Sequence, residues 1–212
     1  MTSDTDSLSD LDFSPTGLAV GDDVADLLFR EARTVNTFAD GEVTDAQLET
    51  VYDLVRWGPT LMNTVPLRLL VVRSRSARER LAAHMAEGNR DRVLAAPLTV
   101  VAAADPSFHE HLDVLVPHNP NARAMFADPD GREAVARSSA MLQIGYLIVG
   151  LRAAGLHVGP MGGMDAAGID AEFFHGSGWR SLMVLNLGTP AGAESVRPRA
   201  PRLSYEQVSA QV

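Results

Sequence analysis

The sequence predicts an α+β fold in which helices flank a small mixed or antiparallel sheet. Three apolar or β-branched runs have strand character, namely Arg68–Arg73, Pro97–Ala104 and Arg180–Leu187. Helical patterns lie between them without strict strand–helix alternation, which favours α+β over a parallel α/β sheet. The chain has 212 residues, 46% of them hydrophobic, so it holds enough apolar material for a core.

Two helices are expected before the first strand. Asp23–Arg33 carries apolar residues at helical spacing, and Thr44-Asp45-Ala46-Gln47 is a capping box that opens a helix to Trp57. Gly58-Pro59 ends that second helix. The apolar positions of the first helix are Val24, Leu27 and Leu28.

The middle of the chain is expected to contain a helix and a long connection. Ser76-Ala77-Arg78-Glu79 is a second capping box and predicts a helix to about Glu87. Residues 105–130 contain four prolines and three histidines, so they predict a lid or binding loop with short helices. Neither segment by itself identifies a function.

One long helix is expected from Gly131 to Ala154, with Gly155 as its C′ residue. Its second half, Ala140–Leu151, is apolar almost all round and therefore predicts burial on all sides. Two explanations stay open: a central core helix, or a helix partly covered by a partner subunit.

The last third is expected to hold mostly turns outside its strand. Leu156–Met164 is a turn segment rich in glycine, proline and methionine, and Asp165 is placed to cap a short helix. Ser204-Tyr205-Glu206-Gln207 is a third capping box, on a terminal helix. We expect residues 1–21 to be a mobile acidic arm and residues 22–212 to form a single domain.

Composition excludes several classes of protein. The formal net charge of −9 argues against nucleic acid as a partner. The chain has no cysteine, and all 18 basic residues are arginine, so thiolate chemistry and lysine-based phosphate binding are absent. The N-terminus has no apolar signal core, and the uncharged stretch Ser138–Leu151 is too short to span a bilayer. We expect a cytoplasmic protein without a membrane partner.

The motifs of common catalytic sites are missing. No serine lies in a G-x-S-x-G turn, and no G-x-G-x-x-G or P-loop occurs. The six histidines lack a metal-ligand spacing, so we expect no metal.

Four segments suit a flat, phosphate-bearing cofactor, although each also fits a plain structural role. Arg33–Asn36 can bracket a phosphate, and the turn-rich loop Trp57–Pro66 can direct Asn63 at a ligand. The glycines of Gly155–Met164 let the backbone approach a ring closely. The fourth segment contributes three candidate phosphate ligands: Arg197, Arg199 and Arg202.

In this order the segments resemble the FMN-dependent nitroreductase family, and within it the malonic semialdehyde reductase (3-hydroxypropionate dehydrogenase-like) branch. The matching stretches are LFREARTVN, VYDLVRWGPTLMN, PH…ARAMF, YLIVGLRAAGLHVGPMGGMD, AEFF and RAPRLSYEQ, from about residue 28 to residue 208. The resemblance implies an intertwined homodimer with FMN at the interface. It also implies a ping-pong reaction in which NADH or NADPH gives hydride to flavin N5 and a small acceptor then takes it.

The resemblance also implies roles for individual residues. Arg33 would contact the FMN phosphate or ribityl chain, and Asn63 would bond the polar edge of the ring. Arg202 would bind phosphate with Arg199 as helper. A backbone N–H of Gly162 or Gly163 would lie near N5, so no catalytic side chain is expected. Other cofactor contacts would come from Thr34, Val35, Pro160 and Met161. We expect Asn63, Gly162 and Arg202 to border one planar cavity.

The chain departs from the family pattern before Asn63, where small residues are usual and Leu61 and Met62 stand instead. These bulky groups alter the pocket in which an acceptor would stack, whether a semialdehyde such as malonic semialdehyde, a nitro compound or a quinone. They also motivate two alternatives: a flavin-dependent oxidase or dehydrogenase of a biosynthetic pathway, and a flavin-binding protein without turnover. Candidate acceptor contacts are Leu61, Met62, Phe108, His118, Arg123 and Phe126.

Overall fold

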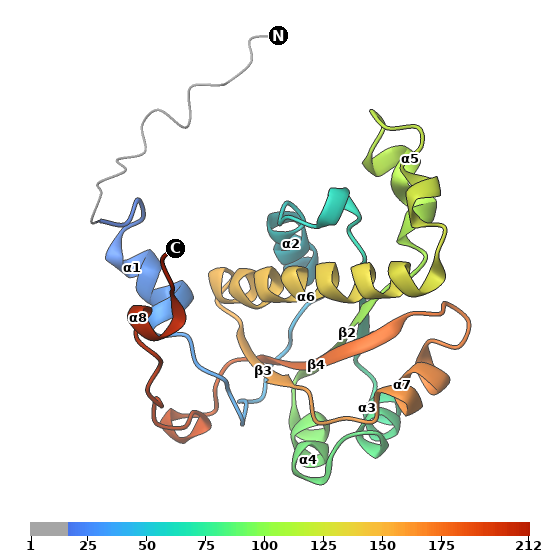
Figure 1. Ribbon diagram of the computed structural model, residues 1–212. Helices are drawn as coiled ribbons and strands as arrows, with labels where there is room; N and C mark the ends of the chain where they lie inside the picture. Colours follow the sequence, from blue (N-terminus) through green and yellow to red (C-terminus); the bar gives the residue numbers. More distant parts are fainter. Residues whose placement is uncertain (1–16) are drawn as a thin grey trace.

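The computed structural model describes residues 17–212 and contains a four-stranded antiparallel sheet in the order β1-β2-β4-β3 (Figure 1). Strands β1 (Leu67–Val72), β2 (Leu98–Ala104) and β4 (Arg180–Gly188) confirm the three predicted strands to within one residue at each end. The α+β prediction is therefore confirmed. Of the acidic arm expected over residues 1–21, residues 1–16 lie outside the described part.

The fourth strand, β3 (His157–Met161), lies where a turn segment was predicted, so that prediction is wrong. The sequence pattern did not indicate this strand because it contains Gly159 and Pro160, and both residue types are rare inside strands. The strand tolerates them because β3 is the edge of the sheet, where proline need not donate to a neighbour. Its Pro160 pairs with Leu185 of β4.

Helices cover both faces of the sheet, which makes three layers (Figure 1). Helix α6 lies across one face with α2 packed on it, while α3, α4 and α7 cover the other. Strand β2 is buried on both faces because its successive side chains point to opposite sides of the sheet. Val100 and Ala102 pack with α6, and Val101 and Ala103 pack on the opposite side. The bounds are α2 Asp45–Val55, α3 Arg75–Ala83, α4 Glu87–Ala95, α6 Pro129–Ala153 and α7 Ala166–Phe173.

Most of the predicted helix ends are confirmed. Thr44 and Gln47 form the capping box of α2, and Asp165 accepts from the Gly168 N–H at 3.0 Å to cap α7. Gly155 has a φ of 76°, and the bond from Leu156 N to Leu151 O (2.8 Å) completes a Schellman end for α6. The expected terminal helix is α8, Tyr205–Val208, behind its capping box.

Two helix predictions were wrong. Helix α3 is capped by Ser74, whose hydroxyl accepts from Ala77 N at 3.1 Å, and not by Ser76, and it ends at Ala83, not near Glu87. Helix α4 follows it and was not predicted, because Glu87–Ala95 is polar and buries only Val93.

The first predicted helix is shorter and differently wound. It consists of α1 (Asp22–Ala25) and one π-helical turn, η2 (Asp26–Arg30). Of the apolar positions that predicted it, Val24 and Leu27 are exposed and Leu28 is partly buried, while Ala25 is the buried residue. The apolar pattern therefore identified a helix but not its burial.

The expected lid loop contains short helices, as predicted. They are η4 (Phe108–His111), α5 (Leu112–Leu115) and η5 (Arg123–Phe126), and they enclose a small apolar cluster against α6. Another short helix, η3 (Leu61–Asn63), precedes β1, and η6 (Ala193–Ser195) follows β4.

Helix α6 is not buried on all sides, so this prediction is wrong for one protomer. Met141, Leu142 and Tyr146 are 45%, 54% and 47% exposed along one side, while Ile144 and Leu147 face the sheet. In residues 17–212, α6 is also the one helix with the length and mean hydropathy of a membrane span, but it packs against the sheet. Its open apolar side favours the explanation that a partner subunit covers it.

The contact between α2 and α6 depends on a glycine. A Cβ on Gly150 would collide with the Cγ1 methyl of Val55. Replacing Gly150 with alanine is therefore expected to destabilise the protein by about 1–3 kcal/mol through overpacking. Urea denaturation measures this. Gly88→Ala in α4 is the control, because a Cβ there meets nothing within 4 Å. Equal stabilities of the two variants would contradict this account of the helix contact.

Candidate functional site

A cavity of about 400 Å³ lies between the segment that follows η2 (residues 32–36), α4 and the C-terminal segment (residues 195–202). Its lining contains five arginines and no acidic residue. No ion pair among residues 17–212 includes any of the five. In a chain of net charge −9 this local excess of positive charge favours an anionic ligand. The arginines are Arg33, Arg92, Arg197, Arg199 and Arg202.

Two neighbouring segments hold Arg33 in place. Val35 N donates to Val158 O of β3 at 3.0 Å, and Asn36 N donates to Ser195 O at 2.8 Å. Arg33 itself donates to the main-chain oxygen of Arg197. The segment from Arg33 to Asn36 therefore lies between β3 and the C-terminal segment, where sequence reasoning placed a phosphate contact.

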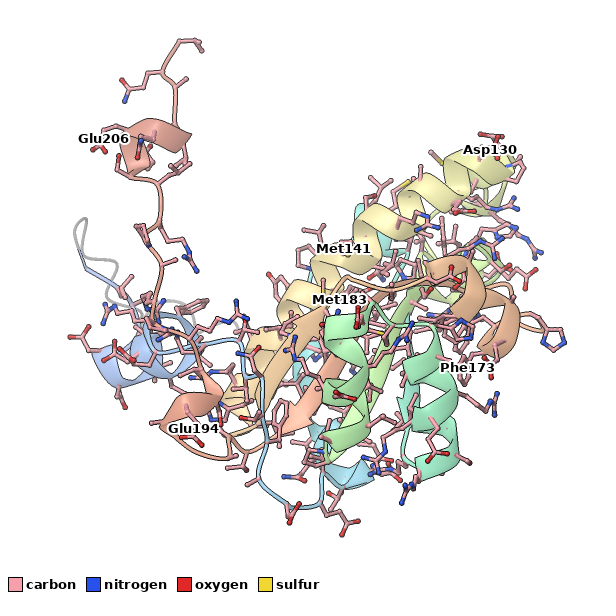
Figure 2. The ribbon with its side chains drawn as sticks, turned by 90° about the horizontal axis from the view of Figure 1, so that it is seen from below. Asp130, Met141, Phe173, Met183, Glu194 and Glu206 are labelled. Atoms are coloured by element: carbon pink, nitrogen blue, oxygen red, sulfur yellow. The ribbon has the colours of Figure 1, made fainter. Side chains whose placement is uncertain are left out.

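The C-terminal segment supplies the outer arginines. Arg199 donates to the oxygens of Arg30 and Ala32 at the end of η2, and Arg202 donates to the oxygens of Ala200 and Pro201. Figure 2 shows the terminal part, with Glu206, standing away from the body of the protomer. These guanidinium groups bond only main-chain oxygens here, so their charges stay available to an anion.

Sequence reasoning missed Arg92, because it missed α4. Its guanidinium donates to Asn89 Oδ1 at 3.2 Å and to Val35 O at 3.4 Å, and its Nε is buried without a partner. Burial lowers the pKa of Arg92, and the positive charge of Arg197 lowers that pKa further. An anion between the two arginines would relieve this repulsion. The signal that was available is the spacing of Asn89 and Arg92, which puts both side chains on one side of a helix.

The glycine-rich end of β3 does not line this cavity but is linked to Arg92 of its lining through Asn89, which accepts from Arg92 and whose Nδ2 donates to Gly163 O at 3.1 Å. A Cβ on Gly162 would meet nothing within 4 Å, so its main chain is open to close approach. At Gly163 the space is filled, because a Cβ would lie 2.9 Å from Asn89 Nδ2. The side chain of Met161 is in the core, so only its main chain is open to a ligand.

Asn63 lies elsewhere in the protomer. Its Nδ2 donates to Leu115 O of the lid at 2.9 Å, and it does not line the arginine cavity. The prediction that Asn63, Gly162 and Arg202 border one cavity is therefore wrong within a single protomer. The backbone of this loop is nonetheless unusual, because Met62, Asn63 and Val65 have positive φ values of 48°, 55° and 42°. Such backbone costs about 1–3 kcal/mol per residue and is commonly found at functional sites.

The lid divides into core residues and open ones. Phe108 is fully buried and packs edge-on against Phe126, with ring centroids 5.0 Å apart. These two rings hold the lid together, so we withdraw them as acceptor contacts. His118 and Arg123 are exposed and remain candidates, as does half-exposed Leu61. Met62 is partly buried against the lid cluster.

An apolar cavity of about 530 Å³ lies on the open side of α6. Its walls carry almost no polar side chains, which is typical of a surface that a protein partner covers. The lining residues are Phe29, Met141, Leu142, Gly145, Tyr146 and Val149.

Comparison with known proteins identifies the family and agrees with the fold. Residues 29–189 match the Nitroreductase family. A Streptomyces coelicolor protein described as an NADH dehydrogenase/NAD(P)H nitroreductase is 54% identical over 184 residues, which cover 86% of this chain and 93% of that protein.

Solved structures are similar in fold at lower sequence identity. A nitroreductase from Exiguobacterium sibiricum in complex with FMN has a TM-score of 0.76 at 15% identity, covering 89% of this chain and 97% of that one. The NADPH:FMN oxidoreductase from Vibrio harveyi complexed with NAD+ has a TM-score of 0.68 at 18% identity, covering 89% and 76%. Because one family match spans most of the chain and a relative shares half its residues, the chain belongs to the nitroreductase family.

Proposed function

We propose that the chain is an FMN-dependent NAD(P)H oxidoreductase that acts as a homodimer on a small acceptor. The arginine cavity carries this proposal, because five guanidinium groups without carboxylate partners surround a space of about 400 Å³ beside a glycine-rich strand end. The nitroreductase relatives are named for NAD(P)H, and one solved neighbour is described with FMN. The residues fit FMN: cations for its phosphate, and open main chain at Gly162 for its ring.

The chain's own groups would bind and orient the cofactor. Arg33, Arg199 and Arg202 would neutralise the phosphate, while Arg92 and Asn89 lie between the phosphate end and the Gly163 main chain. When bound, FMN supplies the centre that accepts and donates hydride. A protein that positions such a cofactor needs no acid or base side chain of its own.

A second copy of the chain would complete the site. Asn63 lies apart from the arginine cavity of its own protomer, and α6 exposes an apolar side beside Phe29. Docking of two such sides would bury Met141, Leu142 and Tyr146. It would also bring a second Asn63 loop to the assembly, where it can face the partner's flavin.

Anaerobic stopped-flow tests the proposed function. The FMN-loaded protein is mixed with NADH or NADPH and then with a panel of semialdehydes, nitroarenes and quinones. The expected result is bleaching of the flavin by at least one nicotinamide and its reoxidation by at least one member of the panel. A protein that binds FMN but is reduced by neither nicotinamide would contradict an NAD(P)H oxidoreductase and favour the oxidase or binding-protein alternatives.

The phosphate end should dominate the affinity for flavin. We expect FMN to bind at least about tenfold more tightly than riboflavin, because each charge-assisted hydrogen bond contributes about 1.5–3 kcal/mol. The affinity for FMN should fall between 0.05 and 0.5 M NaCl, since added salt shortens the Debye length, which is about 10 Å at 0.1 M, and so screens the attraction between exposed charges. Fluorescence titration of both flavins measures this. If FMN and riboflavin bind with equal affinity, or if salt changes both affinities equally, the arginines do not bind the phosphate.

A further inference from the structure

Arg152, in the last turn of α6, is a buried cation without a carboxylate partner. It is 6% exposed, and no ion pair among residues 17–212 includes it. Its Nε and Nη2 donate to Leu27 O at 3.1 and 2.7 Å, and its Nη1 bonds Nδ1 of His157 at 2.8 Å. A guanidinium group has no acceptor and keeps its charge. The imidazole must therefore be the acceptor, with its proton on Nε2.

These bonds join η2 and β3, the two elements between which the segment carrying Arg33 lies. Leu27 belongs to η2, directly before that segment, and its carbonyl is one of the helix-end acceptors that a cation stabilises. His157 is next to Val158, the residue of β3 that bridges Thr34 and accepts from the Val35 N–H. Arg152 thus fixes η2 and β3 relative to each other. Both Arg152 and Arg33 line the same small cavity of about 180 Å³.

We propose that Arg152 and His157 are a positioning pair for the FMN phosphate site, and that protonation of His157 releases the pair and weakens FMN binding in acid. The inference rests on the proposed function, since it needs FMN as the ligand of Arg33. Neither residue touches the cofactor in this proposal: they act through the placement of Arg33.

The charges around His157 determine the direction of the effect. A proton on Nδ1 removes the acceptor and sets a second positive charge 2.8 Å from Arg152. Burial, and then the charge of Arg152, lower the pKa of His157 from its ordinary value of 6.5. Glu31, after η2, is the acidic group that acts on Arg152, and Arg33 shares the cavity beside it. On β4, the residue opposite His157 is uncharged Gly188.

The direction of the pH effect on stability follows from the pKa of His157 in the folded and in the unfolded protein. Because the folded value lies below the unfolded value, the stability that His157 contributes is complete above about pH 6.5 and is lost as the pH falls from there toward the folded value. FMN that binds the form with neutral His157 must, by reciprocity, lower the pKa of His157 further.

The test is the pH dependence of FMN affinity in the full chain. In His157→Asn, the side-chain Oδ1 stands near the position of Nδ1 and accepts from Arg152 without titrating. We expect the Kd for FMN to rise more in the wild type than in His157→Asn between pH 7.5 and 5.5, and by less than about tenfold, because one proton is coupled to binding and the pKa of His157 is lowered from 6.5. The phosphate of FMN also titrates near pH 6. Its contribution is common to both proteins and cancels in the comparison.

Two further measurements keep the proposal open to refutation. His175→Asn, at an exposed histidine after α7, is the matched control and should keep the wild-type pH dependence. NMR titration of His157 in the wild type should show a lower pKa with FMN than without it, which needs no variant. The proposal is overturned if His157→Asn titrates as the wild type does, or if FMN leaves the pKa of His157 unchanged. Failure of the wild type to bind FMN at pH 7.5 would instead contradict the proposed function.

Discussion

Replacing Arg33 with glutamine is expected to weaken FMN binding about ten- to 100-fold. Arg33 is half-buried in the arginine cavity, and main-chain hydrogen bonds hold its segment between β3 and the C-terminal segment, so its guanidinium is kept at the cavity. A hydrogen bond to a charged group contributes about 1.5–3 kcal/mol, and each 1.4 kcal/mol changes an affinity about tenfold. Titration of apoprotein with FMN, followed by quenching of flavin fluorescence, gives both dissociation constants.

Arg75→Gln is the matched control for that experiment. Arg75 is 88% exposed at its side chain and pairs with Glu79 one helical turn away, so its removal should change the Kd for FMN less than about twofold. The variants remove the same charge from the whole chain and differ only in its position. If both bind FMN as the wild type does, Arg33 is not a phosphate ligand. If both lose affinity equally, the effect comes from net charge.

Local sequence patterns predicted the elements whose residues are all in the same kind of environment, such as a strand buried on both faces. Pro97–Ala104 is apolar except for Thr99 because β2 is buried on both faces, and that run alone identifies the strand. The strand β3 contains Gly159 and Pro160, and its existence depends on pairing with β4, which a local pattern does not contain. Helix α4 is likewise defined by tertiary packing through Val93 and not by an apolar stripe.

The same limit applies to the candidate site. Arg33, Arg199 and Arg202 were named from the sequence, and the structure brings them to one cavity. Arg92 was missed because its helix was missed. Asn63 was expected there because it lies in a turn-rich loop that can direct it at a ligand, but the distance between that loop and the arginine cavity depends on the assembled fold. Phe108 resembled an acceptor contact because an aromatic residue in a lid loop and one in a lid core look the same in sequence.

The second large effect concerns the apolar side of α6. Replacing Tyr146 with glutamate is expected to convert the proposed homodimer into monomers at micromolar concentration. Specific dimers bury about 1,200–2,000 Å² in total, and their centres exclude unpaired charge. Tyr146 lines a cavity of about 530 Å³ whose walls also include Phe29, Met141 and Leu142. A carboxylate there would lose its hydration without gaining a partner, at a cost of several kcal/mol. Analytical ultracentrifugation of wild type and variant measures the change.

Leu94→Glu makes this experiment specific to one surface. Leu94 is also about half-exposed, but it belongs to α4 on the opposite face of the sheet. It should leave the dimer intact. If a second Asn63 loop completes the flavin site, Tyr146→Glu must lose FMN together with the dimer, and Leu94→Glu must keep both. A Tyr146→Glu monomer that retains the wild-type Kd for FMN would mean that one protomer suffices for binding, and the partner's loop would then have no part in the site.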